Sequence, residues 1–203
     1  MAFHHYRGDL PAGLTVGDAI AVDTETMGLL PQRDDLCLVQ LSTGDGSAHI
    51  VQLDRRTYDC PNLKALLSDP RILKIFHYAR FDVAFLRKFL GIAVAPVYCT
   101  KIASKIARTY TDRHGLKDLC KELLNIDLSK QQQSSDWGAA ELSEAQLAYA
   151  AADVVHLHEI KARLDAMLTR EGRMGLAAAA FAFVPARAEL DLGGWAEEDI
   201  FAH

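Results

Sequence analysis

The sequence has little cysteine, no long apolar run and no excess of basic residues. Its four cysteines are scattered over the 203 residues and none stands in a Cys-x-x-Cys pair. This indicates reduced, mostly buried thiols and argues against a zinc site. No apolar stretch reaches the roughly 20 residues that cross a bilayer, and Met1 is not followed by the pattern of a signal peptide. We therefore expect a cytoplasmic protein without a membrane segment.

Basic residues are outnumbered by acids. Lys and Arg total 22 against 27 Asp and Glu, which gives a net charge of -5. Proteins that bind long nucleic acids non-specifically carry a basic surface that releases many counterions, so the acidic balance argues against that class. It does not argue against an enzyme that holds one or two phosphates. The segment 101–113, with Lys101, Lys105, Arg108 and Arg113, is either a local basic patch for such a substrate or a solvated helix face.

The chain has no internal repeat, heptad pattern or low-complexity linker, so we predict a single domain over residues 1–203. Apolar patterning predicts strands at 19–26, 36–41, 49–53, 72–76 and 97–99, and helices near 61–67, 81–90, 101–108, 115–124 and 143–182. This order predicts an α/β domain with a mixed central sheet flanked by helices. The tail at 185–203 mixes apolar residues with acids, and we expect it to pack on the domain or on a neighbouring subunit.

Two acids share one face of the first predicted strand. Asp23 and Glu25 are two residues apart in the strand Ala19–Thr26, so both side chains project from the same side. Neighbouring carboxylates at the end of an apolar strand repel each other and are costly to desolvate. A divalent cation removes both costs, and oxygen ligands suit Mg²⁺ or Mn²⁺. A solvated turn explains this pair alone equally well.

Two further acids lie on helix faces that are otherwise apolar. Asp82 shares a stripe with Phe85 and Leu86, and stabilisation by the helix dipole explains its place in the first turn but not its inward direction. Asp153 lies in a second apolar stripe, one turn after Tyr149, where the alternative is a core hydrogen bond between the two. Four inward acids on three elements call for a common counter-charge. A pair of divalent ions supplies it, as in two-metal phosphodiester hydrolysis.

Three ordered motifs carry a resemblance to a known family. They are Asp23-x-Glu25, His77-x-x-Arg80-Phe81-Asp82 and Tyr149-x-x-x-Asp153. In order and spacing they resemble the DEDDy 3′→5′ exonucleases of the ribonuclease D-like group, and the segments 109–116 and 130–137 extend the likeness to its nano-RNase members. The resemblance implies an RNase H-like (DnaQ-like exonuclease) fold and two divalent metal ions, Mg²⁺ or Mn²⁺.

The resemblance also implies a role for each catalytic residue. By position, Asp23 would contact both ions, Glu25 and Asp153 would hold the ion that binds the attacking water, and Asp82 would support the other ion. Tyr149 would orient the water. A phenol with a reference pKa of about 10 is a poor base at neutral pH, so an orienting role suits it better.

Substrate contacts are expected from residues close to these motifs. Leu29 matches the leucine that nano-RNases wedge between the two bases of a dinucleotide, although it also fits an ordinary turn. Arg80 is expected on a substrate phosphate or on one of the acids, and Trp137 either stacks on a base or packs in the core. The full expected set is Thr24, Leu29, His77, Arg80, Ser135 and Trp137.

The function implied by the resemblance is 3′→5′ exoribonuclease activity on very short RNA, above all on dinucleotides, by a homo-oligomer such as an octamer. Two alternatives stay open. One is a broader ribonuclease D-like exonuclease that acts on longer RNA or on DNA. The other is a non-catalytic nucleic-acid-binding module on the same fold. Such relics usually lose an acid, whereas all four acids and the tyrosine are present in this chain.

Overall fold

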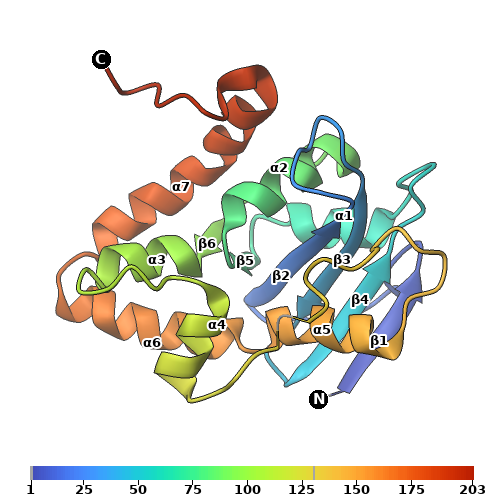
Figure 1. Ribbon diagram of the computed structural model, residues 1–203, viewed down its shortest axis with the longest axis horizontal. Coiled ribbons are helices and arrows are strands. Elements are labelled where there is room, and N and C mark those ends of the chain that lie inside the picture. Colours follow the sequence, from blue (N-terminus) through green and yellow to red (C-terminus); the bar gives the residue numbers. More distant parts are fainter. Residues whose placement is uncertain (1, 130) are drawn as a thin grey trace.

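The computed structural model describes residues 2–129 and 131–203, so Lys130, the first residue of the segment 130–137, lies outside the described residues. A six-stranded mixed sheet forms the centre, in the order β1-β4-β3-β2-β5-β6 (Figure 1). Strands β2 and β4 run antiparallel to β3, whereas β1 is parallel to β4, and β5 and β6 follow β2 in parallel. The strands are β1 (Ala2–Arg7), β2 (Ala19–Thr26), β3 (Leu36–Ser42), β4 (Ser47–Gln52), β5 (Leu73–Phe76) and β6 (Val97–Cys99).

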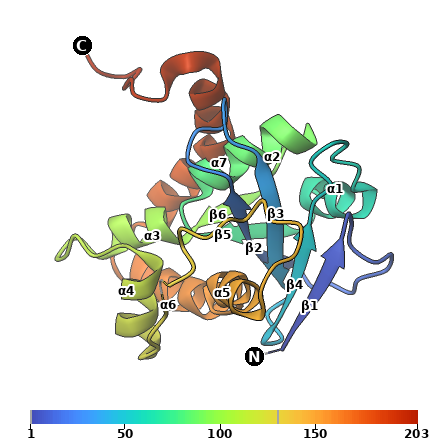
Figure 2. The ribbon, with the colours of Figure 1, turned by 45° about the vertical axis from the view of Figure 1, so that its right-hand side comes forward.

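Helices cover the sheet from both sides. Helix α5 packs across β1 to β4, as Figure 2 shows, and α2 packs against β3, β5 and β6. Every residue of β3 is buried, because both of its faces are covered. The mixed sheet with flanking helices predicted from the sequence is confirmed. The helical elements are α1 (Pro61–Ser68), α2 (Ala79–Leu90), α3 (Thr100–Ala107), α4 (Leu116–Leu119), α5 (Glu144–Val155), α6 (Leu157–Arg170) and α7 (Met174–Leu190), with two short π-helical turns, η1 (Cys120–Leu124) and η2 (Asp191–Trp195).

The element boundaries differ from the prediction at both ends of the chain. Strand β1 was not predicted, and the helical stretch 143–182 is three helices rather than one. The second break lies at Gly172, whose backbone φ of +66° suits a residue without a side chain. Pro185 lies inside α7, so the expected tail begins later than predicted. The alanine-rich turns before Pro185 favour a helix. None of the described helices has the length and apolar character of a membrane span.

The first part of the tail is tied to the domain by two arginines. Arg80 Nε lies 2.5 Å from Asp191 Oδ2, and Arg80 Nη2 donates to the carbonyl of Ala196 at 2.6 Å. Arg187 Nη2 donates to the carbonyl of Trp195, also at 2.6 Å. Beyond these contacts Phe201 is 76% exposed, and the last residues project from the end of α7 away from the sheet (Figures 1 and 2).

The short length of β5 opens the sheet beside the acidic end of β2. The register of β5 with β2 runs from Ala19 to Ala21, and β5 ends at Phe76. The chain then turns through Tyr78, which has a left-handed backbone, into the first turn of α2. On this edge the second half of β2 therefore faces the start of α2 instead of β5, while its other edge pairs with β3.

Lys74 on β5 is fully buried, and we predict that its ammonium stabilises the loops around the sheet. Its Nζ donates to the carbonyls of Asp69, Ile72 and Ala95 at 2.7–2.8 Å. Lys74→Met keeps the length of the side chain but removes the donor that these three carbonyls share. It should lower the free energy of unfolding by about 3 kcal/mol. Urea denaturation measures this change.

The matched control for that experiment is Lys105→Met, because Lys105 is exposed on α3. It should change the free energy of unfolding by less than about 0.5 kcal/mol. Equal stability of the Lys74→Met variant and the parent would show that the three carbonyls do not depend on this ammonium.

Candidate active site

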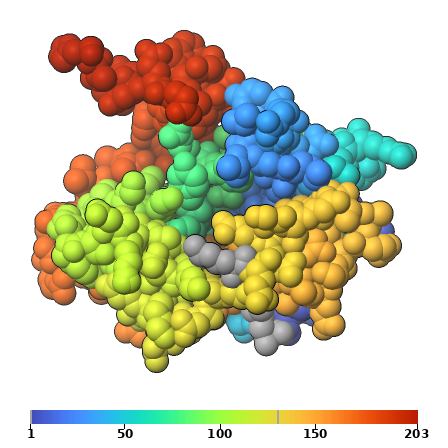
Figure 3. All heavy atoms as spheres, viewed as in Figure 1, coloured from blue at the N-terminus to red at the C-terminus, as the bar shows by residue number. Residues whose placement is uncertain are grey.

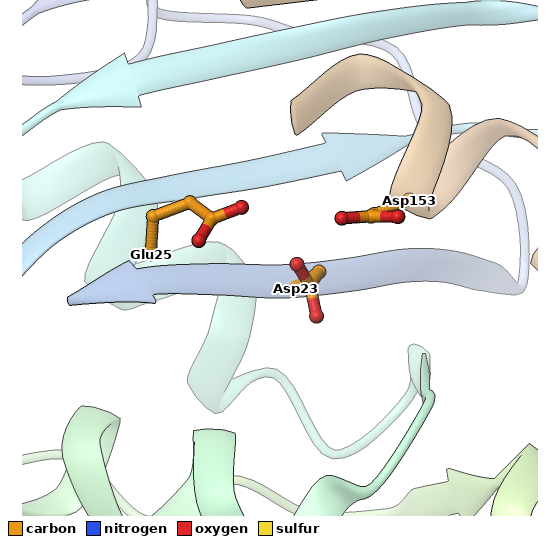
Figure 4. A group of neighbouring side chains, drawn as sticks. All are labelled: Asp23, Glu25 and Asp153. Carbon is orange, nitrogen blue, oxygen red and sulfur yellow. The ribbon is translucent and has the colours of Figure 1, made fainter. Parts of the chain in front are cut away.

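Three carboxylates from two elements converge at the centre of the molecule. Asp23 and Glu25 project from one face of β2, and Asp153 comes from the last turns of α5 (Figure 4). One carboxylate oxygen from each residue lies within 4.8 Å of the others. This spacing allows a single cation to contact all three.

The fourth acid, Asp82, lies in the first turn of α2 and is only 2% exposed. The hydroxyl of Thr24, which stands between Asp23 and Glu25 on β2, donates to Asp82 Oδ1 at 2.7 Å. This hydrogen bond joins the strand to the helix. Thr24 was expected to contact substrate; it lines the cavity, and its hydroxyl donates to Asp82. Asp82 lines the same cavity as the other three acids.

Burial and mutual repulsion raise the pKa values of these four carboxyls. Burial raises the pKa of Asp23 well above its usual value, and Asp82, Asp153 and Glu25 raise it further by repulsion. Burial and the same acidic neighbours also raise the pKa of Glu25. Burial raises the pKa of Asp82 and of Asp153 to about 7. A bound cation would reverse this tendency by favouring the charged forms.

The residues present fit a hard divalent cation. The ligand atoms of the converging group are carboxylate oxygens, the donors that Mg²⁺ and Mn²⁺ prefer. The buried Asp82 and the three half-buried acids form no ion pair with a described residue, although carboxylates removed from water ordinarily have a positive partner. Their arrangement therefore suits divalent metal binding better than a structural hydrogen-bond network.

Gln40 belongs to this site and was missed in the sequence. It lies opposite Asp23 in the register of β2 with β3, and its Nε2 donates to Asp23 Oδ2 at 2.7 Å. The bond lowers the pKa of Asp23, against the effect of burial, and fixes the direction of the carboxylate. A glutamine within the apolar run Leu36–Leu41 was the available signal, because buried polar side chains usually have a specific partner.

Tyr149 lines the cavity from α5, one turn before Asp153. The ring of Trp137 lies beside it, with centroids 6.0 Å apart. Trp137 is only 3% exposed and belongs to the hydrophobic core. It also lines the cavity. Trp137 therefore packs in the core, and its stacking on a base stays a prediction. Its contact supports Tyr149.

The acids open into a cavity of about 610 Å³ that holds most of the expected substrate contacts. Leu29 lines its mouth and is 77% exposed, so it is not a core residue. Ser135 also lines it and donates from Oγ to Gln132 Oε1 at 2.6 Å. Figure 3 shows the segment 131–143 (yellow) beside the loop 27–35 (blue), on the face that also carries the start of α2 (green).

Of the two substrate contacts expected on the second motif, Arg80 is bound elsewhere and His77 lies in the cavity. Arg80 does not line the cavity and does not pair with any of the four acids. Its guanidinium donates two hydrogen bonds to the carboxylate of Asp191. It is two residues before Asp82 on the helix and so points to another side. His77 does line the cavity, but its Nδ1 lies 2.8 Å from Thr100 Oγ1. Burial lowers the pKa of His77 to about 3, so it is neutral at pH 7.

The segment 101–113 is not a uniform basic patch. Arg108 is fully buried and bonds to Glu122, Ser104 and the carbonyl of Arg113. Lys101 lies at the other end of the segment and lines a cavity next to the acids. The basic residues of the segment therefore have different partners and do not form one surface.

A family model described as a 3′-5′ exonuclease matches residues 9–169. This chain belongs to that 3′-5′ exonuclease family. The structure of *Brucella melitensis* NrnC with bound Mg²⁺ is 55% identical, with a TM-score of 0.95 and full coverage of both chains. NrnC of the same organism bound to pGG is 56% identical, with a TM-score of 0.96 and coverage of 100% of this chain and 99% of that chain. The predicted likeness to nano-RNase C is confirmed.

More distant relatives are larger proteins. Ribonuclease D of *Gluconacetobacter diazotrophicus* is 37% identical over 155 residues, which are 76% of this chain and 39% of that protein. The crystal structure of *Escherichia coli* RNase D is 27% identical with a TM-score of 0.75, and covers 85% of this chain and 45% of that one. The chain thus spans less than half of the length of these relatives. Together with the mixed sheet they confirm the predicted RNase H-like, DnaQ-like exonuclease fold.

Mg²⁺ is predicted to raise the melting temperature, and to raise it more at pH 8 than at pH 5. The folded pKa of about 7 for Asp82 and Asp153 lies above the unfolded value of about 3.9. The metal-free fold therefore loses stability as the pH rises from about 4 to about 7, because the unfolded chain has released these protons while the fold still binds them, and above about pH 7 the folded groups ionise as well. The same ionisation frees the ligands for the cation. Calorimetry with Mg²⁺ or with EDTA at both pH values measures the difference.

Asp153→Asn is the control for this experiment. It removes one ionising ligand, so its melting temperature in EDTA should exceed that of the parent at pH 8 and approach it at pH 5. Its response to Mg²⁺ should also be smaller. A Mg²⁺ effect of equal size at both pH values would argue that these carboxylates do not form the cation site.

Proposed function

We propose that this chain is a metal-dependent 3′→5′ exoribonuclease that hydrolyses very short RNA, with dinucleotides cut to mononucleotides as its main reaction. The observation that carries this proposal is the convergence of Asp23, Glu25 and Asp153 within 4.8 Å, with Asp82 on the same cavity. Membership of the 3′-5′ exonuclease family and the likeness to NrnC support it. The two-metal mechanism and the dinucleotide substrate are the finer parts of the proposal.

The residues divide the chemistry between them. Divalent ions, when bound, stabilise the charge that develops on the phosphate and on the attacking and leaving oxygens. Asp23, Glu25 and Asp153 would hold one ion, and Asp82 with Asp23 would hold the second. Gln40 keeps the carboxylate of Asp23 in position. The water oxygen forms the new bond to phosphorus, the ribose 3′-oxygen leaves, and a 5′-phosphomononucleotide is released.

Tyr149 would orient the attacking water. Burial and the neighbouring acids raise the pKa of its phenol above the ordinary value, so the hydroxyl stays protonated at neutral pH. A protonated phenol holds a water by a hydrogen bond but does not act as a base. Trp137 packs beside the ring and limits its movement. Ser135 and the neutral His77 line the cavity and are proposed as polar contacts to the substrate.

Three features support a short substrate. The cavity of about 610 Å³ falls in the range of small-molecule sites. Leu29 is exposed at its mouth and is proposed to wedge between the two bases. The net charge of -5 suits a ligand with few phosphates. The NrnC structure described as bound to pGG agrees with this size of ligand. We further propose a cytoplasmic homo-oligomer, an octamer by analogy with nano-RNase C.

The proposed function predicts that dinucleotides are the best substrates. Digestion of 5′-labelled RNA from two to seven nucleotides with Mn²⁺ should give a rate that falls as length increases, because longer strands do not fit the cavity. EDTA should stop the reaction. Denaturing gel electrophoresis measures the products. A rate that rises with length would instead favour the broader exonuclease, and matched DNA oligonucleotides test its substrate range.

Asp153→Asn is the matched control in this digestion, because it retains the shape of the side chain. It should lower the rate by at least about 1000-fold, since the loss of one ligand disrupts the metal site. Cleavage at the parental rate by this variant would reject the assignment. Absence of cleavage by the parent at every length would leave the non-catalytic binding module as the better account.

Leu29→Ala is predicted to raise KM for dinucleotides about tenfold and to leave the melting temperature unchanged. The side chain is exposed, so its removal costs little folding energy. The loss of base contact should weaken substrate binding. Steady-state kinetics with an unlabelled dinucleotide measures KM. Met27→Ala, a less exposed apolar residue of the same loop, is the comparison, and parental kinetics in Leu29→Ala would remove the wedge from the proposal.

A further inference from the structure

Among the described residues, no lysine or arginine lines the catalytic cavity. Its acids are all negatively charged when ionised, Arg80 is held by Asp191, and His77 bonds to Thr100. A phosphate that approaches the acids nevertheless gains most from an opposite charge nearby. Bound metal ions supply part of this charge at the reacting phosphate. A side chain of the protein could supply further positive charge for a substrate phosphate.

A second cavity of about 280 Å³ continues the first and supplies candidates. The two cavities share Asp23, Tyr149 and Asp153, so they meet at the acids. In the described part of the chain, the lysines and arginines that line either cavity are Lys101 and Lys117, both in the second. Lys117 is exposed, whereas Lys101 is half-buried. Lys101 is therefore the better placed cation.

The position of Lys101 is fixed by its surroundings. It lies in the first turn of α3, directly after Thr100, whose hydroxyl donates to the carbonyl of Phe76 at 3.1 Å. This bond ties the start of α3 to the end of β5. The Lys101 ammonium lies 4.1 Å from the ring centroid of Tyr78, a favourable cation–π contact. Among the described residues Lys101 forms no ion pair.

Tyr78 is itself an unusual residue. Its backbone φ is +69°, in the left-handed region that a tyrosine rarely adopts. It is 44% exposed and lines both cavities. A strained backbone that carries a large exposed ring next to an active site points to a role for that ring. The ring supports the Lys101 ammonium from one side.

We propose that Lys101, held by the ring of Tyr78, binds a phosphate group of the substrate beside the acids. The proposal rests on the proposed function and adds a substrate-binding residue to it. A dinucleotide with a 5′-phosphate offers two phosphates, the bridging one and the terminal one. The shared chemistry is a phosphate oxygen that accepts a charge-assisted hydrogen bond from the ammonium. Tyr78 acts through Lys101 and is a positioning residue.

Binding of unlabelled dinucleotides tests this assignment without relying on turnover. All variants are made in the Asp153→Asn background, and isothermal titration with Mg²⁺ compares pGG with GpG, which lacks the terminal phosphate. Lys101→Met should weaken binding of pGG about tenfold or more, and Lys101→Arg should restore most of the affinity. Lys105→Met, one turn further along α3 and exposed, is the matched control and should bind like the background.

The salt dependence separates an electrostatic role from a structural one. If Lys101 neutralises a phosphate, the slope of log Kd against log salt should fall by about 0.7 in Lys101→Met. The melting temperature should not change. A loss of affinity for pGG alone identifies the terminal phosphate, and a loss for both ligands identifies the bridging one. Parental affinity for both ligands in Lys101→Met would overturn the proposal.

Two substitutions test the part of Tyr78. Asn tolerates the left-handed backbone, so Tyr78→Asn should keep the fold, remove the ring and weaken binding of pGG as Lys101→Met does. Tyr78→Phe keeps the ring and should bind like the background. In a double variant with Lys101→Met, Tyr78→Asn should add little further loss. Unchanged affinity in Tyr78→Asn would remove Tyr78 from the proposal.

Failure of this proposal and failure of the proposed function give different results. If the parent protein cleaves dinucleotides and Lys101→Met binds them normally, the function stands and the phosphate ligand lies elsewhere. If the parent cleaves no RNA but Lys101→Met still weakens binding of pGG, the binding residue stands and the catalytic assignment fails.

Discussion

Repulsion between four carboxylates that are largely removed from water is the constraint on which this structure depends. Asp23, Glu25, Asp82 and Asp153 come from three elements and lie around one cavity, and burial raises the pKa of each. Such a cluster is unfavourable unless a positive charge joins it. The fold therefore holds in place a group of carboxylates whose repulsion a bound divalent cation would relieve. The sheet and helices supply the rigidity that this requires.

Several neutral contacts hold the acids without neutralising them. Thr24 bonds to Asp82 and so joins β2 to α2, and Gln40 bonds to Asp23 across the strand pair. Neither partner carries a charge, so neither competes with a cation for the site. The early end of β5 leaves space for α2 to bring Asp82 to β2. Arg80, the nearest strong cation on α2, is kept away from the acids by Asp191.

Local periodicity explains why the directions of the four acidic side chains could be predicted from the sequence. The alternation in β2 placed Asp23 and Glu25 on one side, and helical spacing placed Asp82 and Asp153 on inward faces. The features that were missed depend on contacts between distant segments. The Arg80–Asp191 pair joins residues 111 positions apart, and no local pattern indicates the partner. Gln40 gains its position beside Asp23 from the strand register. Lys101 was named in the sequence only as part of a basic segment, and its contact with Tyr78 depends on the fold. Breaks between α5, α6 and α7 were hidden by a nearly continuous helical pattern.

Anomalous scattering from crystals grown with Mn²⁺ tests the central claim most directly. The account predicts one anomalous peak within about 2.5 Å of oxygens of Asp23, Glu25 and Asp153, and a second one between Asp23 and Asp82. Both peaks should vanish in crystals treated with EDTA. Ordered carboxylates at these four residues with Mn²⁺ bound only elsewhere on the protein would contradict the account.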